Sequence, residues 1–348
     1  METDVDVLVI GASQTGLAAA YYLKMTNANF VVVGREKRVG DVWRKRYDSL
    51  VLFTPRRYSS LPGLTLEGEQ DGYAAKDEIA EYLERYVQRF DLPVRLETEV
   101  RSLTKEQGIF RIQTSGGEWR ARNVIVATGP FQKPRIPEFA ASIDKDLVQL
   151  HTSEYLNPSD LQEGSVAVVG AGNSGAQIAV ELSKDRDVLL SVGHKMKFLP
   201  LKAFGKSMFW WFDKLGMLEA TIHSAFGHLI SRQPDPIFGL ELRSLIREGR
   251  VEVKPRATRV QDQTVIFEDG SKAQVRNLIW ATGFRSDYSW IKIPDVLDGK
   301  GKPVHIRGVS RIDGLYFLGL PWQYRRGSAL IGGVGRDAEY VINHIRDL

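Results

Sequence analysis

Cysteine is absent from this chain of 348 residues. Its absence excludes disulfide bonds, thiolate metal sites and any redox cycle built on a pair of catalytic cysteines. A role as a disulfide reductase is therefore excluded on chemical grounds. Histidine is also scarce, because only six are scattered along the chain without the spacing of metal ligands, so we predict no metal site.

Long apolar runs and a strong charge imbalance are missing as well. No segment approaches the roughly 18 uninterrupted apolar residues of a membrane-spanning helix, and a strand predicted close to the N-terminus leaves no room for a signal peptide. The 47 basic and 43 acidic residues give a net charge of +4 without a basic tail, which argues against nucleic-acid binding. We expect a cytoplasmic, globular protein with no integral membrane segment, long enough for two domains.

Glycine, by contrast, occurs in two informative turns. Residues 11–16 read GASQTG and follow the apolar run 5–10, and residues 170–175 read GAGNSG and follow the apolar run 166–169. Each turn opens a helix-forming stretch that leads to another short apolar run. This order is the context in which such a pattern indicates a dinucleotide-binding unit. Two units predict two nucleotides, and two nucleotides held close together suggest electron transfer between them.

A second repeated pattern supports an internal duplication. Residues 123–129 read NVIVATG, and residues 277–283 read NLIWATG. Both halves therefore end on a predicted buried strand that leads into an Ala-Thr-Gly turn. We predict an α/β protein with two Rossmann-like dinucleotide-binding domains.

The second turn has every glycine that phosphate binding requires. Gly170 suits the tight turn, Gly172 lets a pyrophosphate approach the backbone, and Gly175 lets the helix pack closely on the strand. The phosphates would lie at the helix N-terminus, where free N–H groups favour negative charge. The first turn departs from this pattern because Ser13 stands at the middle position, where its hydroxyl could face phosphate or weaken binding.

The residue after the second strand of each unit usually selects the ribose. An acid binds two hydroxyls, whereas a basic group accommodates a 2′-phosphate. In the first unit Gly34 replaces the acid, and Glu36 could substitute for it. In the second unit Ser191 ends the strand, and His194 and Lys195 follow. These favour NADPH, with NADH plausible because no arginine is present there; Lys195 could equally be a solvated loop charge.

Together these motifs resemble the flavin-containing monooxygenase family, which holds FAD and NADPH on tandem Rossmann domains. The resemblance spans nearly the whole chain, and the short length and residues 50–62 look like the small bacterial branch. Residues 198–238 are similar to an insertion of YUCCA-type monooxygenases. The motifs that carry the resemblance are the two glycine turns, RVGDVW at 38–43, YDSL at 47–50, both Ala-Thr-Gly strand ends, and His151 with Tyr155.

The resemblance implies a domain order and a chemistry. Residues 1–136 and 285–348 would form the two parts of an FAD-binding domain, and residues 137–284 an inserted NAD(P)H-binding domain. NADPH would reduce the flavin, and O2 would then give a C4a-(hydro)peroxyflavin that oxygenates a soft nucleophile such as a sulfide or amine. The implied partners are a small-molecule substrate and O2, and a homodimer stays open.

The resemblance also assigns residues by position. The FAD-side residues are Gly11, Ser13, Gln14 and Gly16 at the pyrophosphate, Glu36 at the ribose, Trp43, Arg44 and Asp48 near the flavin, Thr128 and Gly129 at its border, and Gln323 in the tail. The NAD(P)H-side residues are Gly170, Gly172, Asn173, Ser174, Gly175, Ser191, His194, Lys195, Thr282 and Gly283. The candidate catalytic residues are Phe53, Thr54 and Asp48.

Two departures from the family pattern leave alternatives open. Of the signature between the domains only His151 remains, and it could contact the cofactor or cap a linker turn. Phe53 and Thr54 occupy the loop where larger relatives carry an asparagine that holds the peroxide, and a phenyl ring cannot donate a hydrogen bond. An NAD(P)H oxidase without productive oxygenation is therefore an alternative. A non-catalytic dinucleotide sensor is another, because Ser13 and Gly34 could leave FAD weakly held. The aromatic run 208–212 could be core, substrate mouth, dimer surface or membrane-surface contact.

Overall fold

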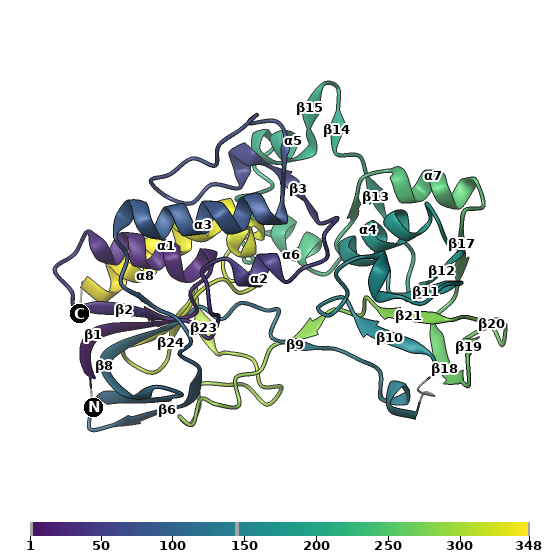
Figure 1. The fold of residues 1–348 in the computed structure, drawn as a ribbon. Helices are drawn as coiled ribbons and strands as arrows, with labels where there is room; N and C mark the ends of the chain where they lie inside the picture. Colours follow the sequence, from purple (N-terminus) through teal and green to yellow (C-terminus); the bar gives the residue numbers. More distant parts are fainter. Residues whose placement is uncertain (1–2, 143–145, 347–348) are drawn as a thin grey trace.

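A computed structural model describes residues 3–142 and 146–346, and it contains two separate parallel sheets with helices packed against them (Figure 1). The predicted α/β class with two Rossmann-like domains is confirmed. The strands of the first sheet come from both ends of the chain, and those of the second sheet come from the middle. Boundaries at 136/137 and 284/285 stay a prediction, and they lie beside the two chain crossings described below.

The first sheet has the order β25-β8-β1-β2-β5, with neighbouring strands parallel. On one edge β24 and β23 continue it in antiparallel fashion, and β6 and β7 form a hairpin on the early part of β8. The strands are β1 (Thr3–Ile10), β2 (Phe30–Val33), β5 (Val94–Arg95), β6 (Val100–Glu106), β7 (Ile109–Thr114), β8 (Gly117–Val126), β23 (His305–Ile306), β24 (Val309–Ser310) and β25 (Leu315–Phe317).

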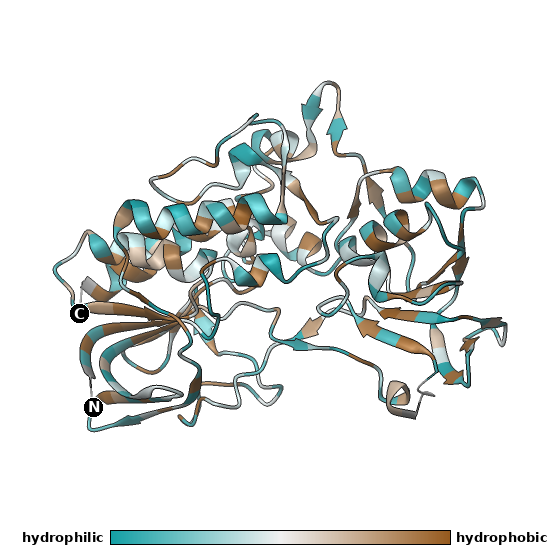
Figure 2. Ribbon diagram, viewed as in Figure 1, coloured by the Kyte–Doolittle hydropathy of each residue, from teal (hydrophilic) through white to brown (hydrophobic). Residues whose placement is uncertain are grey.

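The central strands of this sheet are buried on both faces, as their unbroken apolar sequences predict. Along β1 the side chains alternate, so that Val7 and Val9 pack under the helices while Leu8 and Ile10 pack on the opposite face. These strands are among the most hydrophobic parts of the molecule (Figure 2). Helices α1, α3 and α8 cover one face in Figure 1; the helices of this part are α1 (Gln14–Lys24), α2 (Asp41–Arg44), α3 (Lys76–Phe90) and α8 (Val334–Arg346).

The second sheet has the order β10-β21-β11-β12-β17 and is parallel throughout. Its strands are β10 (Val148–His151), β11 (Val166–Val169), β12 (Val188–Ser191), β17 (Val251–Lys254) and β21 (Asn277–Trp280), with helices α4 (Asn173–Leu182) and α7 (Glu241–Arg247). An antiparallel sheet of β18 (Ala257–Gln261), β19 (Thr264–Phe267) and β20 (Lys272–Gln274) packs beside it.

The chain crosses between the two sheets twice, and the crossings lie side by side. Strand β9 (Lys133–Pro134) leaves the first part, and β22 (Phe284–Arg285) returns to it; the two are paired antiparallel. The Arg46 guanidinium lies 4.9 Å from the Phe284 ring centre and 5.3 Å from that of Phe131. This contact attaches the crossing strands to the loop that follows α2.

Residues 198–238 form a small unit that contacts the first part of the molecule. Its elements are β13 (Phe198–Leu199), β14 (Lys202–Ala203), β15 (Lys206–Ser207), α5 (Met208–Lys214), α6 (Ala225–Ser231) and β16 (Ile237–Phe238), and it faces β3 (Val51–Pro55) and β4 (Tyr73–Ala75). The Tyr73 hydroxyl donates to the Leu201 carbonyl at 3.2 Å, and the Ile222 amide donates to the Tyr324 carbonyl at 2.9 Å. Within 208–212, Phe209 and Phe212 are buried core residues.

Candidate functional site

The two glycine turns have the same backbone geometry at their first glycine. Gly11 has φ of 117° after β1, and Gly170 has φ of 111° after β11. A Cβ added at Gly11 would lie 2.5 Å from the Ala127 carbonyl oxygen, and one at Gly170 would lie 2.3 Å from that of Ala281. Both positions therefore require glycine, for the conformation and for the close approach of the neighbouring strand end.

The last glycine of each turn determines how closely the following helix packs against the turn. A Cβ at Gly16 would lie 1.9 Å from the Gly11 carbonyl oxygen, and a Cβ at Gly175 would lie 2.1 Å from that of Gly170. Because no side chain fits there, α1 and α4 start directly over the ends of their strands. Their free N–H groups consequently point at the space beyond the turn, where an anion is stabilised.

The middle position differs between the turns, and the backbone explains why serine is tolerated. Gly172 has φ of −79°, Ser13 has φ of −117°, and both are extended. No atom lies within 4 Å of a Cβ built on Gly172. The Ser13 hydroxyl donates to Gln14 Oε1 at 2.5 Å, and Gln14 Oε1 also accepts from Trp43 Nε1 at 3.2 Å. Serine thus fits the first turn and links it to α2.

The missing acid of the first unit has a structural cause. A Cβ at Gly34 would lie 2.6 Å from the Ala12 Cβ, so an acidic side chain does not fit at position 34. Glu36 Oε2 lies 3.5 Å from that same point. The carboxylate of Glu36 therefore occupies the place beside the first turn where the ribose acid is expected, and this supports the prediction for Glu36.

The loop after β12 carries more positive charge than its local sequence indicates. Gly193, His194 and Lys195 are exposed, and Arg256, 63 residues further along, donates from Nη2 to the Gly193 carbonyl at 3.3 Å. Residues 191–195 contain no arginine, but the fold brings Arg256 to this position. Local sequence could not indicate Arg256, because parallel pairing of β12 with β17 brings it there. The Ser191 hydroxyl is used internally: it donates to the Pro255 carbonyl at 2.9 Å and accepts from an amide of β18 at 2.8 Å.

Asn173 and Ser174, the predicted polar residues of the second turn, connect it to neighbouring segments. Asn173 accepts from the Phe238 amide at 2.9 Å and donates to the Pro236 carbonyl at 3.1 Å. Ser174 lies beside Tyr47, whose hydroxyl donates to Gln177 Oε1 of α4 at 2.9 Å. Burial raises the pKa of the Tyr47 phenol to about 12. The second turn is thus held against both the 198–238 unit and the first part of the chain.

Arg44 and Asp48, predicted near the flavin, both have internal partners. Arg44 donates to the Val39 carbonyl at 2.7 Å and pairs with Glu84 at 2.9 Å. Asp48 accepts from Lys76 Nζ at 2.8 Å and from Asn157 Nδ2 at 2.9 Å. Together, the Lys76 and Asn157 hydrogen bonds hold the pKa of the Asp48 carboxyl below its usual range. These contacts give Asp48 a role in joining the two parts of the molecule, and its catalytic assignment stays a prediction.

Phe53 and Thr54 lie where β3 meets the 198–238 unit. The Phe53 ring stacks on Phe238 with 4.6 Å between ring centres and 9° between planes. The ring centres of Phe209 and Phe53 are 6.1 Å apart. The Thr54 hydroxyl is hydrogen-bonded to the Ser59 hydroxyl at 2.9 Å. Neither predicted side chain therefore presents a free hydrogen-bond donor, and Phe53 belongs to a cluster of packed aromatic rings.

The Ala-Thr-Gly strand ends lead into open space at their glycines. Gly129 has φ of 67° and Gly283 has φ of 78°, and no atom lies within 4 Å of a Cβ at either position. Thr128 accepts from Gln132 at 2.9 Å, and Thr282 donates to the Arg135 carbonyl. The backbone at both glycines is accessible to a ligand, as the predicted border positions require.

His151 is fully buried at the end of β10. Its Nε2 is 3.0 Å from the Gly283 carbonyl oxygen, and its Nδ1 is 2.8 Å from the Ser153 hydroxyl. Burial lowers the pKa of the His151 imidazole. Both ring nitrogens thus have partners in the segments that join the two parts. This favours a role in capping the linker turn over a contact with the cofactor.

Gln323 lies in the loop after β25, and its Nε2 is close to Gly308 and to Val341 in the middle of α8. Its Oε1 accepts from the Leu320 amide at 3.3 Å, whereas its buried Nε2 has no hydrogen-bond partner within residues 3–142 and 146–346. A buried amide donor without a partner is costly. Gln323 thus keeps an unsatisfied buried donor, and its assignment to the cofactor stays a prediction.

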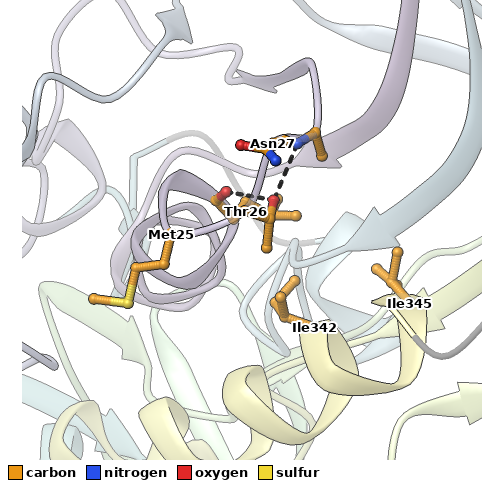
Figure 3. A pocket seen from close by; sticks show the side chains of 7 residues that line it. Met25, Thr26, Asn27, Ile342 and Ile345 are labelled. Atoms are coloured by element: carbon orange, nitrogen blue, oxygen red, sulfur yellow. Dashed lines mark hydrogen bonds between the residues drawn. The ribbon is translucent and has the colours of Figure 1, made fainter.

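A cavity of about 410 Å³ lies elsewhere, between the C-terminal end of α1 and α8 (Figure 3). It is lined by Leu23, Met25, Thr26, Asn27, Ala28, Ile342 and Ile345. The glycine turn is at the opposite end of α1, roughly 16 Å away along the helix, so this cavity is separate from the candidate site. Among the described residues no acid–histidine cluster could hold a metal, and no helix could cross a membrane.

The fold and the paired turns define a dinucleotide-binding oxidoreductase. Residues 8–197 match the family of pyridine nucleotide-disulphide oxidoreductases, and the chain belongs to this family. It is similar to an "Uncharacterized oxidoreductase CzcO-like" of Geobacillus kaustophilus, with 65% identity over 99% of both chains. It is also similar to the "Uncharacterized oxidoreductase CzcO" of Bacillus subtilis, with 48% identity over 98% of this chain and 99% of that one.

Solved structures show the same architecture. A flavin-containing monooxygenase from Stenotrophomonas maltophilia is 28% identical and superposes with a TM-score of 0.83 over 99% of both chains. A bacillithiol disulfide reductase from Staphylococcus aureus superposes with a TM-score of 0.76 at 15% identity over 99% of both chains, which shows a shared fold. The chain is an oxidoreductase of the family named above, with an architecture shared by flavin monooxygenases.

Proposed function

We propose that the protein is an FAD-dependent oxidoreductase that uses NADPH and O2 to oxygenate a soft nucleophile, such as a sulfide or an amine. The observation that carries this proposal is the pair of equivalent turns, each with a glycine held at positive φ against an Ala-Thr-Gly strand end. The similarity to a flavin-containing monooxygenase over 99% of the chain supports the choice of reaction.

The residues present fit both cofactors. Gly11 and Gly16 leave the space in which an FAD pyrophosphate fits, and Glu36 places a carboxylate where the ribose hydroxyls would lie. Gln323 has an orphaned buried donor close to α8. FAD, when bound, would accept hydride from the nicotinamide and transfer electrons to O2. Disulfide reduction by a pair of cysteines, which the family name suggests, is not possible here because the chain has no cysteine.

Positive charge at the second turn supports NADPH rather than NADH. His194, Lys195 and Arg256 surround Gly193, and all three side chains are exposed. A guanidinium can bind a 2′-phosphate through two hydrogen bonds, which a ribose hydroxyl cannot use in the same way. NADH would bind through the shared pyrophosphate contacts alone and therefore more weakly.

The chain's own part in oxygenation would be to position groups and exclude water. Phe53, Phe209 and Phe238 form apolar walls beside the second turn. Such walls bind an apolar sulfide or amine and keep bulk water away from the reacting atoms. The same observation supports a second candidate, an NADPH oxidase that releases peroxide, since neither Phe53 nor Thr54 has a free donor to stabilise oxygen-derived charge.

One experiment separates these two candidates. The protein is purified, loaded with FAD, and supplied with NADPH in air with or without an aryl methyl sulfide. Oxygenation predicts that one sulfoxide forms for each NADPH consumed, with little peroxide. Peroxide equal to the NADPH consumed, whether or not sulfide is present, would assign the oxidase activity. A protein that binds no FAD would contradict both and leave a dinucleotide sensor.

A further inference from the structure

The hairpin of β14 and β15 carries a strained and exposed aromatic residue at its tip. Phe204 and Gly205 form a two-residue turn, with φ of 51° and 72°. Such a turn favours asparagine followed by glycine, because a bulky side chain at positive φ is strained. Phe204 is nevertheless 94% exposed. Its one aromatic contact, with Trp211, leaves almost the whole ring accessible, so packing does little to compensate for this strain.

The hairpin projects from the body of the molecule and is hydrogen-bonded to α5 (Figure 1). Trp211 Nε1 donates to the Ala203 carbonyl at 3.0 Å, and the Met208 amide donates to the Leu201 carbonyl at 2.9 Å. The Phe204 ring meets Trp211 edge to face, with 6.2 Å between ring centres. The aromatic tip is thus held in one orientation, at the outer end of the 198–238 unit.

Basic side chains surround these aromatic rings. Lys202 and Lys206 flank the tip, and Lys206 and Lys214 each place Nζ 5.9 Å from the Trp210 ring centre. None of the three lysines forms an ion pair with another residue that the structure describes. The acid of α5, Asp213, accepts a hydrogen bond from Tyr58 at 3.3 Å and so is directed at the protein body.

We propose that the 202–207 hairpin and α5 bind the surface of an anionic lipid bilayer. The Phe204 ring would enter the boundary between headgroups and acyl chains, and Trp210 and Trp211 would lie at headgroup level, where amphipathic rings are favoured. Lys202, Lys206 and Lys214 would contact lipid phosphates, each contributing attraction within the Debye length of the surface.

A bilayer fits this surface better than a second copy of the chain. A stable protein interface buries about 800 Å² on each partner, which is more than a two-residue tip flanked by lysines can supply. Insertion of a single apolar tip between charged headgroups needs no matching surface. The lysines on both sides of the tip complement negative headgroups.

The test uses the full chain with vesicles made of equal parts phosphatidylglycerol and phosphatidylcholine, compared with vesicles of phosphatidylcholine alone. Flotation should recover the protein only with the anionic vesicles, and the tryptophan emission should shift to shorter wavelength. Phe204→Asn, which suits the turn, should weaken binding by roughly tenfold or more, since it removes the buried ring. The double variant Lys202→Gln and Lys206→Gln should weaken binding similarly and reduce its dependence on salt.

Ile306→Asn is the matched control, because Ile306 is a similarly exposed apolar residue, 79% accessible, on β23. It should bind anionic vesicles like the native chain. Phe204→Asn should melt no lower than the native protein, which separates a lost contact from misfolding. Equal vesicle binding by Phe204→Asn and native protein would overturn the proposal. So would a lack of binding combined with a Phe204-dependent dimer in sedimentation, which would assign the hairpin to a second copy.

Discussion

Replacing Gly172 with alanine should weaken NADPH binding and leave the fold intact, whereas the same change at Gly170 should destabilise the fold. The two residues lie in one turn, two positions apart, and differ in what a Cβ would meet. At Gly170 it would lie 2.3 Å from the Ala281 carbonyl oxygen at φ of 111°, and at Gly172 it would meet nothing within 4 Å.

The expected magnitudes follow from those contacts. A Cβ almost never approaches another atom more closely than 3.0 Å, so Gly170→Ala must move β21 or the turn by roughly 0.7 Å. Positive φ costs about 1–3 kcal/mol, and overpacking costs about 1–3 kcal/mol more. We expect unfolding free energy to fall by about 2–6 kcal/mol, and the melting temperature by at least about 4 °C.

Gly172→Ala should change the unfolding free energy by less than about 1 kcal/mol, because its φ of −79° suits alanine. The new methyl group would instead fill the space through which the pyrophosphate approaches the backbone. NADPH affinity should fall at least about tenfold, which is about 1.4 kcal/mol.

Thermal unfolding without nucleotide and titration calorimetry with NADPH together measure both effects. Two results would contradict this prediction: a loss of stability in Gly172→Ala equal to that in Gly170→Ala, or NADPH binding by Gly172→Ala as tight as that of the native protein. Either result would mean that the space before Gly172 is not where the nucleotide lies.

Three further outcomes are expected. Alanine at both His194 and Lys195 should raise the KM for NADPH several-fold and leave the KM for NADH nearly unchanged. Adding Arg256→Ala should increase the effect on NADPH to roughly 10- to 100-fold. Equal changes for both nucleotides would contradict binding of the 2′-phosphate by these side chains. Burial holds the pKa of His151 below its unfolded value of about 6.5. The neutral imidazole therefore contributes its full stabilisation above that pH and loses it as the pH falls through the folded pKa. The melting temperature of His151→Gln should depend less on pH between about 7 and 5 than that of the native protein, and an unchanged pH profile would contradict this role for His151. Glu36→Gln should lower FAD occupancy after purification by removing a charge-assisted hydrogen bond, and full occupancy would exclude a ribose contact.

The sequence was most informative where a residue type has one physical reason to occur. Gly11 and Gly170 were predicted from their place after a strand, and the structure gives both the positive φ that only glycine adopts easily. The Ala-Thr-Gly repeat likewise predicted the strand that meets each turn. These features are local, so spacing along the chain was sufficient to find them.

Contacts between distant segments were beyond sequence reasoning. Arg256 lies 63 residues from Gly193, and only the pairing of β12 with β17 brings it there. The stack of Phe53 on Phe238 depends in the same way on how the 198–238 unit folds back on β3. Asp48 was predicted as a candidate catalytic residue from the family resemblance, and its hydrogen bonds to Lys76 and Asn157 could not be foreseen.

Because β9 pairs with β22, the middle of the chain is inserted into the first part of the molecule at a single place. Because Pro134 lies opposite Phe284, the chain leaves the first sheet and re-enters it at one point. A short hairpin loop could bridge these two residues without stretching any strand of the first sheet. The same geometry allows a whole nucleotide-binding unit to be gained, lost or exchanged between proteins by one insertion event, with the surrounding sheet order left as it was.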